Sequence, residues 1–591
     1  MANLFNSIKV PKLKRNKFNL SHDVCLTSEF GKLVPILCEE VLPGETYKLS
    51  TQQLVRLAPL KAPYMSAVDV YTYSFFVPNR LIWKDWKDFI TGKDEELIHP
   101  YLQVKFKQDT GSPFSVYTSG YKGHKDKQSN ELKTSSLLDY LGMPVIDENT
   151  DIGPASTSGY VNIDPFPLYA YQLIYDEYFR DQNLQNSITD AIELQSGINV
   201  ANKDSSTPEG LDQTLFYNLL KIRNKCWKKD YFTSALTEPQ ASSDVVGKLP
   251  FSGDATAQFA NGTHAPIGYN KNKSTYVRDL AGGLVTSTAD LGTSGNGLLE
   301  QGGNQRVLDF KDSNYADLSN ISAGINFGES SAVLNINELR RLYRIQTLLE
   351  RDNRGGGRYV EQLLSHFGVK SSDGRLQRPE FLGGSKIPII VGEVLQTSES
   401  TSNSPLAQPA GNAAAAGVSR QFKRFFEEHG WLITVMCVLP KAYYSQGMPR
   451  KFSRSSRFDY YWPEFAHLGE QPILEKELYY VPDSLSEALN TNNDVFGYTP
   501  RYAEYKFSPS RVCGDFKTNM AFWHLGRLFN TAPRLNSDFV TMKAKEVNRI
   551  FAVEGFDEQG NEVNNYDHLW IQVHNDLKKL SPMPKYGTPM F

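Results

Sequence analysis

The glycine-rich stretch RDNRGGGRY, Arg351–Tyr359, holds residue types that can bind phosphate through backbone amides and arginine side chains. A Walker-type phosphate loop follows a strand and needs a fixed glycine spacing that ends in Lys-Ser or Lys-Thr. This stretch has neither that spacing nor that pair, and it follows a segment with helical periodicity. We therefore predict a helix end with a tight turn here, and not a phosphate site.

Histidines and carboxylates are the other residues whose spacing bears on catalysis or metal binding. His568 and His574 lie six residues apart, and no H-E-x-x-H or Cys/His ligand pattern occurs. We expect these two to be structural, together with three histidines in apolar surroundings, His429, His467 and His524. There is no G-x-S-x-G motif and no EF-hand loop, although calcium binding by loop carboxylates stays open. We predict no catalytic residue, no metal ligand and no cofactor.

The N-terminal segment is strongly basic. Before the first acid, Asp23, it carries five cations and no anion: Lys9, Lys12, Lys14, Arg15 and Lys17. Such a segment can neutralise phosphates, and Phe5 and Phe18 can stack on bases. We predict that the five cations bind nucleic acid, with a solvated tail as the alternative.

A second basic cluster precedes the aromatic run FDYYWPEF and consists of Arg450, Lys451, Arg454 and Arg457. Aromatic and arginine side chains together are typical of protein interfaces. For this cluster we favour a structural or interface role over contact with nucleic acid.

Composition limits the class of protein. The chain has 591 residues and a formal net charge of -3, so it is not a basic nucleic-acid binder as a whole. Its five cysteines form no C-x-x-C pair, and we expect free thiols in a reducing cytoplasm. The N-terminus lacks the apolar core of a signal peptide, and Trp431–Leu439, the longest apolar run, is too short to span a membrane.

Most of the periodic segments predict strands. Val68–Val77 alternates with a period of two, and Trp431–Leu439 reads as a strand that is buried on both faces. Helical spacing occurs in three places, Leu81–Ile90, Asn335–Glu350 and Tyr359–Phe367. The pattern alone predicts a large fold dominated by β-structure, such as a β-sandwich.

Three segments have unusual composition, and each taken alone is typical of disorder. Residues 241–330 are rich in glycine and lack Trp and Cys, Ser398–Gly417 is of low complexity, and residues 580–591 are rich in proline. Tyr586, Met590 and Phe591 in the last segment are apolar anchors that can fill pockets on another subunit. Packing of this tail on its own chain is the alternative.

Several phrases resemble the major capsid proteins of microviruses, the small single-stranded-DNA bacteriophages, and in particular the gokushovirus branch. The longest is RLQRPEFLGGSKIPIIVGEVLQ at Arg375–Gln396. The others are, in chain order, FFVPNRLIWKDW, EYFRDQNL, CWKKDYFTSAL, RDNRGGGRY, SHFGV, YYWPEFAHLGEQ and FGYTPRYAEYK. Together they cover most of the chain outside residues 241–330.

This resemblance implies a viral jelly-roll β-sandwich, an eight-stranded antiparallel barrel with long inter-strand insertions and a few short helices. It divides the chain into a basic arm (1–20), a jelly-roll core (21–240 and 331–579), a glycine-rich surface insertion at the threefold axes (241–330) and an extended tail (580–591). Host attachment is the hypothesis for the insertion, and inert decoration is the alternative.

The resemblance also implies the partners and the location of the protein. It implies an icosahedral homo-oligomer in the virion, assembled in the host bacterial cytoplasm, without membrane insertion. It implies a single-stranded DNA genome and a small basic DNA-packaging protein as partners, and a host surface receptor is a further candidate. A carbohydrate-binding or carbohydrate-cleaving β-sandwich is the competing function, because aromatic richness suits both classes.

Overall fold

A computed structural model describes residues 14–105, 135–143, 160–194, 196–199, 218–241, 277–279, 284–285, 306–308, 336–395, 409–482, 491–552, 555–556, 562–563 and 567–586. The chain divides into two compact units. The first unit combines Met1–Ser242 with Leu349–Phe591, and the second is Ser243–Leu348. The second unit therefore begins close to the insertion predicted at 241–330 and ends further along the chain.

The larger sheet of the first unit has six antiparallel strands. Their order is β1-β20-β4-β14-β13, and β2 also pairs with β20. The strands are β1 (Asn16–Asn19), β2 (His22–Ser28), β4 (Thr46–Leu57), β13 (Ile390–Leu395), β14 (Pro409–Phe425) and β20 (Leu569–Ser581). Because β1 and β2 pair with successive parts of β20, they act as one interrupted strand.

A four-stranded antiparallel sheet faces the larger one. Its order is β12-β5-β15-β3, and its strands are β3 (Val34–Val41), β5 (Val68–Pro78), β12 (Glu380–Pro388) and β15 (Gly430–Pro440). Side chains from both sheets share one buried cluster that includes Leu37, Leu432, Leu49 and Leu577. The predicted jelly-roll class is confirmed, with six and four strands in the two sheets in place of a simple eight.

One strand path connects the two sheets at a corner. β12 pairs with β5 in the smaller sheet, whereas β13 pairs with β14 in the larger one. Only Ile389 separates β12 from β13, and its side chain is buried. A strand that changes sheets at such a bend is a known way to close a sandwich.

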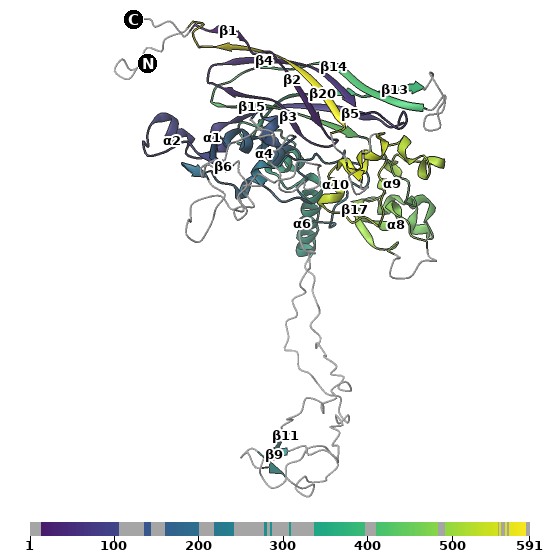
Figure 1. Cartoon of the computed structure of the whole chain (residues 1–591). Coiled ribbons are helices and arrows are strands. Elements are labelled where there is room, and N and C mark those ends of the chain that lie inside the picture. The colour runs from purple at the N-terminus through teal and green to yellow at the C-terminus, as the bar shows by residue number, and fades with distance from the viewer. Residues whose placement is uncertain are drawn as a thin grey trace. The chain divides into compact units, whose positions relative to one another are not determined.

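The smaller sheet is covered on both faces. Helix α4 (Phe166–Tyr178) lies against the face that points away from the larger sheet (Figure 1). The Tyr171 hydroxyl donates a hydrogen bond to the Leu33 carbonyl at 2.8 Å, and the rings of Phe75 and Tyr178 are 4.7 Å apart. This cover confirms that the apolar run in β15 is a strand buried on both faces.

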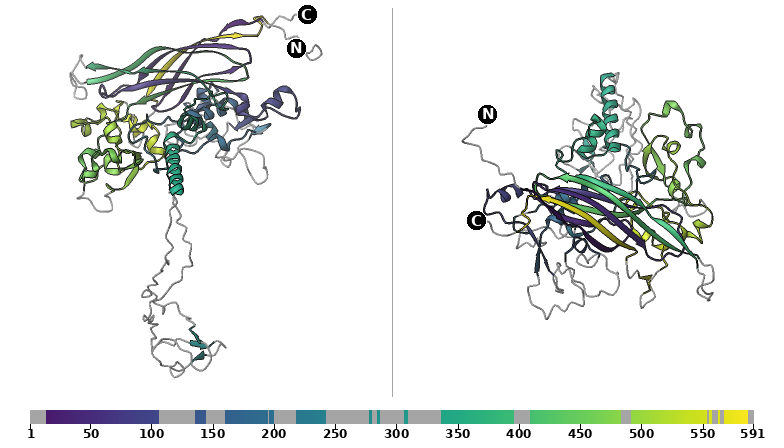
Figure 2. Two further views of the ribbon diagram at one scale, coloured as in Figure 1. Left: turned by 180° about the vertical axis from the view of Figure 1, so that it is seen from behind. Right: turned by 90° about the horizontal axis from the view of Figure 1, so that it is seen from above.

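The larger sheet is covered on one face. Buried and more exposed residues alternate along β4 and β20, so that one side of each strand faces the smaller sheet. In the view from above, no described element lies over the other side (Figure 2). We call this side the open face. It is an antiparallel sheet surface in contact with solvent in the isolated chain.

The predicted helices are confirmed with one change. α6 (Ile336–Gly355) and α7 (Tyr359–Phe367) end at glycines, and Gly356 and Gly368 adopt positive φ. The helix predicted at Leu81–Ile90 is wrong as a single element. It is two short helices, α1 (Asn79–Ile82) and α2 (Trp86–Thr91), because Trp83 adopts an extended backbone and is buried.

The low-complexity segment Ser398–Gly417 has a composition that is typical of disorder when it is taken alone, but Pro409–Gly417 is ordered, and Ser398–Gln408 lies outside the described residues. These residues form the first half of β14, between β13 and β4. Ala413 and Ala415 are buried, and small side chains fit where two sheets approach. Ladder hydrogen bonds on both sides stabilise a segment whose composition is typical of disorder.

The remaining elements are short. In the first unit they are β6 (Tyr101–Lys105), α3 (Leu137–Tyr140), β7 (Tyr160–Ile163), β8 (Ile198–Asn199), β16 (Glu470–Leu474), α8 (Glu475–Leu478), β17 (Val495–Pro500), α9 (Ala503–Lys506), α10 (Ser537–Val540), β18 (Gly555–Phe556) and β19 (Glu562–Val563). Strands in the second unit are β9 (Val277–Asp279), β10 (Leu284–Val285) and β11 (Arg306–Leu308).

Candidate interaction surfaces

The basic N-terminal segment joins the larger sheet. Lys14, Arg15 and Lys17 are exposed, whereas Lys9 and Lys12 lie outside the described residues, as does Phe5. From Asn16 the chain forms β1, so residues 16–19 belong to the sheet and Phe18 is half-buried. The Arg15 guanidinium lies 5.1 Å from the centre of the Phe425 ring. The described cations are therefore held at one end of the sheet.

The C-terminal segment lies at this same end. β20 continues to Ser581, which pairs with Asn16, and the Asn16 side-chain amide donates to the Met583 carbonyl at 2.7 Å. Tyr586 is 73% exposed, while Met590 and Phe591 lie outside the described residues. Two segments that are far apart in the sequence thus lie side by side (Figure 1).

An exposed aromatic patch surrounds the second basic cluster. Its members come from residues 450–468 and from the segment around α9, and each is at least 43% exposed: Phe452, Phe458, Tyr460, Tyr461, Trp462, Leu468, Tyr505 and Phe507. We call this set the aromatic patch. An exposed cluster of large apolar side chains marks a surface that another molecule covers.

The basic residues of this cluster hold the patch in place. The Arg450 guanidinium is 2.8 Å from a buried Glu477 carboxylate. The Arg454 guanidinium lies 5.1 Å from the Tyr460 ring centre and 4.6 Å from that of Tyr505. These cations already have partners inside the chain, which supports the predicted structural or interface role.

The structure gives several predicted structural histidines a clear partner. His568 is buried, lies 2.7 Å from a Glu29 carboxylate oxygen and stacks on Phe551. Burial lowers the pKa of His524, helped by the nearby Arg549, while the Phe516 carbonyl acts in the opposite direction. Within the described part of the chain, no group of three His, Cys, Asp or Glu side chains is placed to hold a metal ion.

No helix among the described residues is long and apolar enough to cross a membrane. All five cysteines are free. Burial raises the pKa of the Cys437 thiol to about 12, and nearby Lys225 acts against this shift, so this sulfur stays protonated and packs as an apolar group.

Comparison with known proteins decides the family. The family model "Capsid protein (F protein)" matches residues 6–591. The chain belongs to this capsid protein family. It is 32% identical to "Capsid protein VP1" of Chlamydia phage 1, an alignment that covers 100% of this chain and 98% of the relative.

Other relatives agree with this assignment. Identity is 32% to "Capsid protein VP1" of Bdellovibrio phage phiMH2K, over 97% of this chain and 95% of the relative. Identity is 27% to the protein of the same name in Spiroplasma virus 4, over 99% and 97%. The protein is therefore a capsid protein that self-assembles and resides in the virion. Membership of this structural protein family supports the capsid function over the competing carbohydrate-cleaving function.

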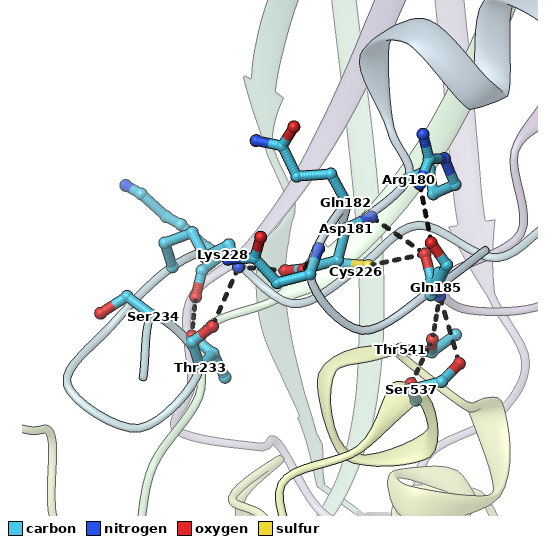
Figure 3. A network of polar contacts seen from close by, with 12 residues as sticks. Arg180, Asp181, Gln182, Gln185, Cys226, Lys228, Thr233, Ser234, Ser537 and Thr541 are labelled. Atoms are coloured by element: carbon cyan, nitrogen blue, oxygen red, sulfur yellow. Dashed lines mark hydrogen bonds and ion pairs between the residues drawn. The ribbon is translucent and has the colours of Figure 1, made fainter. Parts of the chain in front are cut away.

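The phrases that carried the family resemblance connect parts of the capsid protein that are distant in sequence. The Gln185 side chain, just after EYFRDQNL, accepts from the Asp181 amide at 3.0 Å and donates to Thr541 at 2.9 Å (Figure 3). The Cys226 sulfur is 4.0 Å from this same side-chain carbonyl oxygen. This network joins the CWKKDYFTSAL phrase to α10.

The glycine-rich loop after α6 has a similar connecting role. The Gln182 side chain accepts from the Gly357 and Arg358 amides at 3.1 and 3.2 Å and donates to Glu361. Arg354 forms an ion pair with Glu470, in YYWPEFAHLGEQ. The amides of RDNRGGGRY thus serve the fold, and the prediction of a helix end is confirmed. Sequence reasoning missed this role because the partners lie more than 100 residues away.

Proposed function

We propose that the capsid protein forms a small icosahedral shell around the single-stranded DNA genome of a bacteriophage, with the open face and the N-terminal arm toward the DNA. The observation that carries this proposal is the attachment of the arm. β1 pairs with β20, so Lys14, Arg15 and Lys17 emerge at the end of the open face. Lys9 and Lys12 precede them in sequence, and we propose that all five cations bind the DNA.

Replacement of the five arm cations tests this proposal. A variant with Lys9, Lys12, Lys14, Arg15 and Lys17 changed to Gln should retain less DNA per particle. For single-stranded DNA, each lost phosphate contact reduces the magnitude of the slope of log K against log[salt] by about 0.7. The slope should therefore fall by up to about 3.5. A matched variant with five exposed lysines from other surfaces changed to Gln should behave as wild type: Lys87, Lys221, Lys370, Lys517 and Lys545. Unchanged DNA retention in the arm variant would reject the proposal.

A separate small basic packaging protein is part of the proposal. The coat subunit has 63 Lys and Arg against 66 Asp and Glu, so it cannot neutralise a genome by itself. Mass spectrometry of DNA-filled particles should detect a small, very basic protein that is absent from empty shells. Assembly takes place in the host bacterial cytoplasm, which suits five free cysteines.

Two surfaces are proposed as subunit contacts, the aromatic patch and the C-terminal tail. Large interfaces place aromatic and arginine side chains at their centre. Trp462→Ala should reduce particle yield while lowering the melting temperature of the free subunit only slightly, because the residue is 44% exposed and its indole donates one hydrogen bond, to the Arg457 carbonyl. Trp570→Ala, on the open face and 41% exposed, is the matched control. Equal yields from both variants would remove the patch from the interface.

The tail requires a truncation that spares β20. Removal of everything after Leu580 would also delete Ser581 and Met583, which contact Asn16. Truncation after Pro584 retains these contacts and removes Tyr586, Met590 and Phe591. We expect a folded subunit with impaired assembly. A normal particle yield would favour packing of the tail on its own chain.

For residues 241–330 we propose an outward insertion at the threefold axes that binds a host surface receptor. Its low charge and high glycine content suit a variable surface loop. Deletion of the segment should reduce infection much more than assembly. Full infectivity of an assembled deletion particle would leave inert decoration as its role.

A further inference from the structure

Three lysines lie directly opposite one another on the open face. Register pairs Lys578 of β20 with Lys48 of β4, and Lys48 with Lys423 of β14. Lys48 and Lys423 are exposed, and the Lys578 side chain is 38% exposed. We call these three residues the lysine row. Because neighbouring strands are about 4.8 Å apart, the backbones of the three lysines lie within roughly 10 Å of one another.

Such a row disfavours folding of the isolated chain. Like charges directly opposite each other on neighbouring strands repel. Only Lys578 has a local carboxylate partner, Asp576 at 2.9 Å, and the described residues offer no carboxylate to Lys48 or Lys423. A fold that keeps an unfavourable charge arrangement on an uncovered surface indicates an anionic partner.

The surroundings of the row extend the positive charge. On one side of the lysine row, Arg420 of β14 pairs with Ser50 of β4, which in turn pairs with Asp576 of β20. On the other side of the lysine row, Lys17 of β1 pairs with Leu580 of β20. Phe425, which pairs with Thr46 next to the row, is 42% exposed. An exposed aromatic ring beside clustered cations is the composition with which proteins bind single-stranded nucleic acid.

We propose that the lysine row, Lys48, Lys423 and Lys578, binds the phosphate backbone of single-stranded nucleic acid, with Phe425 as a stacking surface for a base. This inference rests on the proposed function, and it adds a built binding surface to the arm. The arm supplies cations from one continuous segment. The row exists only because three strands pair in this register.

The other occupant to consider is an acidic surface of a second copy of the chain. The exposed charge and the aromatic ring favour nucleic acid, because the row joins the arm cations at one end of the sheet. The two occupants predict different results. Loss of the row would weaken DNA binding in the first case and particle assembly in the second.

The test is an equilibrium titration of the full-length, unassembled subunit with fluorescein-labelled (dT)20 at several NaCl concentrations. A Lys48→Gln, Lys423→Gln, Lys578→Gln variant should lower the slope of log K against log[NaCl] by about 2, or three contacts at about 0.7 each. The matched control changes Lys370, Lys517 and Lys545 to Gln and should keep the wild-type slope. Replacement of the row by Arg should also keep it.

Thermal unfolding separates binding from folding. The melting temperature of the row variant should stay close to that of wild type, because removal of mutually repelling charges offsets the loss of the exposed ion pair between Lys578 and Asp576. A lower melting temperature would show that the row stabilises the fold and would overturn the inference. An unchanged slope, or an equal loss in the matched control, would overturn it too.

Comparison with the arm variant separates this inference from the proposed function. If only the arm variant lowers the slope, the arm binds DNA and the row does not. If only the row variant does, the inference stands and the arm proposal fails. If neither does, both fail. A row variant that binds (dT)20 normally but forms no particles would assign the open face to a subunit contact.

Discussion

The two sheets of this capsid protein differ in what covers them. β15, in the four-stranded sheet, lies between the larger sheet and α4, and ten of its eleven residues are buried. β20, in the six-stranded sheet, alternates between buried and more exposed positions. A strand enclosed on both faces serves packing alone, whereas a strand with an open face is free to present charges to a partner.

The largest expected effect is a cavity in the doubly covered sheet. Ile433 in β15 is 0% exposed, and Val418 on the open face of β14 is 69% exposed. Ile433→Ala should lower the free energy of unfolding by about 4 kcal/mol, because it removes buried methyl groups and leaves a cavity. Val418→Ala should change it by less than about 0.5 kcal/mol. Urea unfolding of the free subunit measures both, and similar losses would break the comparison.

A buried carboxylate fixes the helix that covers the smaller sheet. Asp176 in α4 accepts hydrogen bonds from Ser187, Ile188 and Thr189 and forms an ion pair with Arg180. Asp176→Ala should cost about 3 kcal/mol, because it leaves a largely buried arginine without its partner. Asp190→Ala, at an exposed position, is the control. A loss below 1 kcal/mol for Asp176→Ala would show that the helix does not need this anchor.

The same carboxylate predicts an acid limit. Burial alone would raise the pKa of Asp176, but hydrogen bonds from Ser187 and Thr189 and the charge of Arg180 lower it below 3.8. Its contribution is therefore present above the unfolded pKa and is lost as the pH falls through the lower, folded pKa. Between pH 5 and pH 2, the free energy of unfolding should fall less steeply with decreasing pH for Asp176→Asn than for wild type. Parallel curves would contradict this assignment.

The double glycine of the FLGG phrase marks where the two sheets approach. A Cβ on Gly383 in β12 would overlap the backbone carbonyl oxygen of Gln421 in β14. A Cβ on Gly392 in β13 would only touch the Asn412 carbonyl oxygen, at 3.5 Å. Gly383→Ala should therefore cost about 2 kcal/mol, and Gly392→Ala much less. Melting temperatures of the two variants provide the measurement, and equal values would contradict close approach of the sheets at this point.

The smallest expected effect is the loss of an ion pair on the open face. His574 lies 2.7 Å from Asp23, and their side chains are 41% and 60% exposed. Solvent-exposed pairs of this kind contribute less than about 1 kcal/mol. Asp23→Asn should change the free energy of unfolding by about 0.5 kcal/mol or less at pH 6, as urea unfolding would show. A loss in the free energy of unfolding as large as that of Asp176→Ala would mean that contacts on the open face stabilise the fold as much as buried contacts do.

Local patterns predicted much of the fold. The alternation at Val68–Val77 and the apolar run at Trp431–Leu439 both correspond to strands, and Gly368 ends a helix as expected. Trp83 shows the limit of such patterns. Its helical spacing is real, but packing of its ring against Phe89 and Phe166 favours an extended backbone at that position.

Local periodicity and short ordered phrases were enough to predict the strands at Val68–Val77 and Trp431–Leu439, the helices α6 and α7, and the capsid family. In contrast, the pairing of strands in the folded sandwich places the arm and the tail at one end of a sheet and brings Lys48, Lys423 and Lys578 into a row. Strand register between segments hundreds of residues apart depends on the packing of the whole sandwich, and no local pattern encodes it.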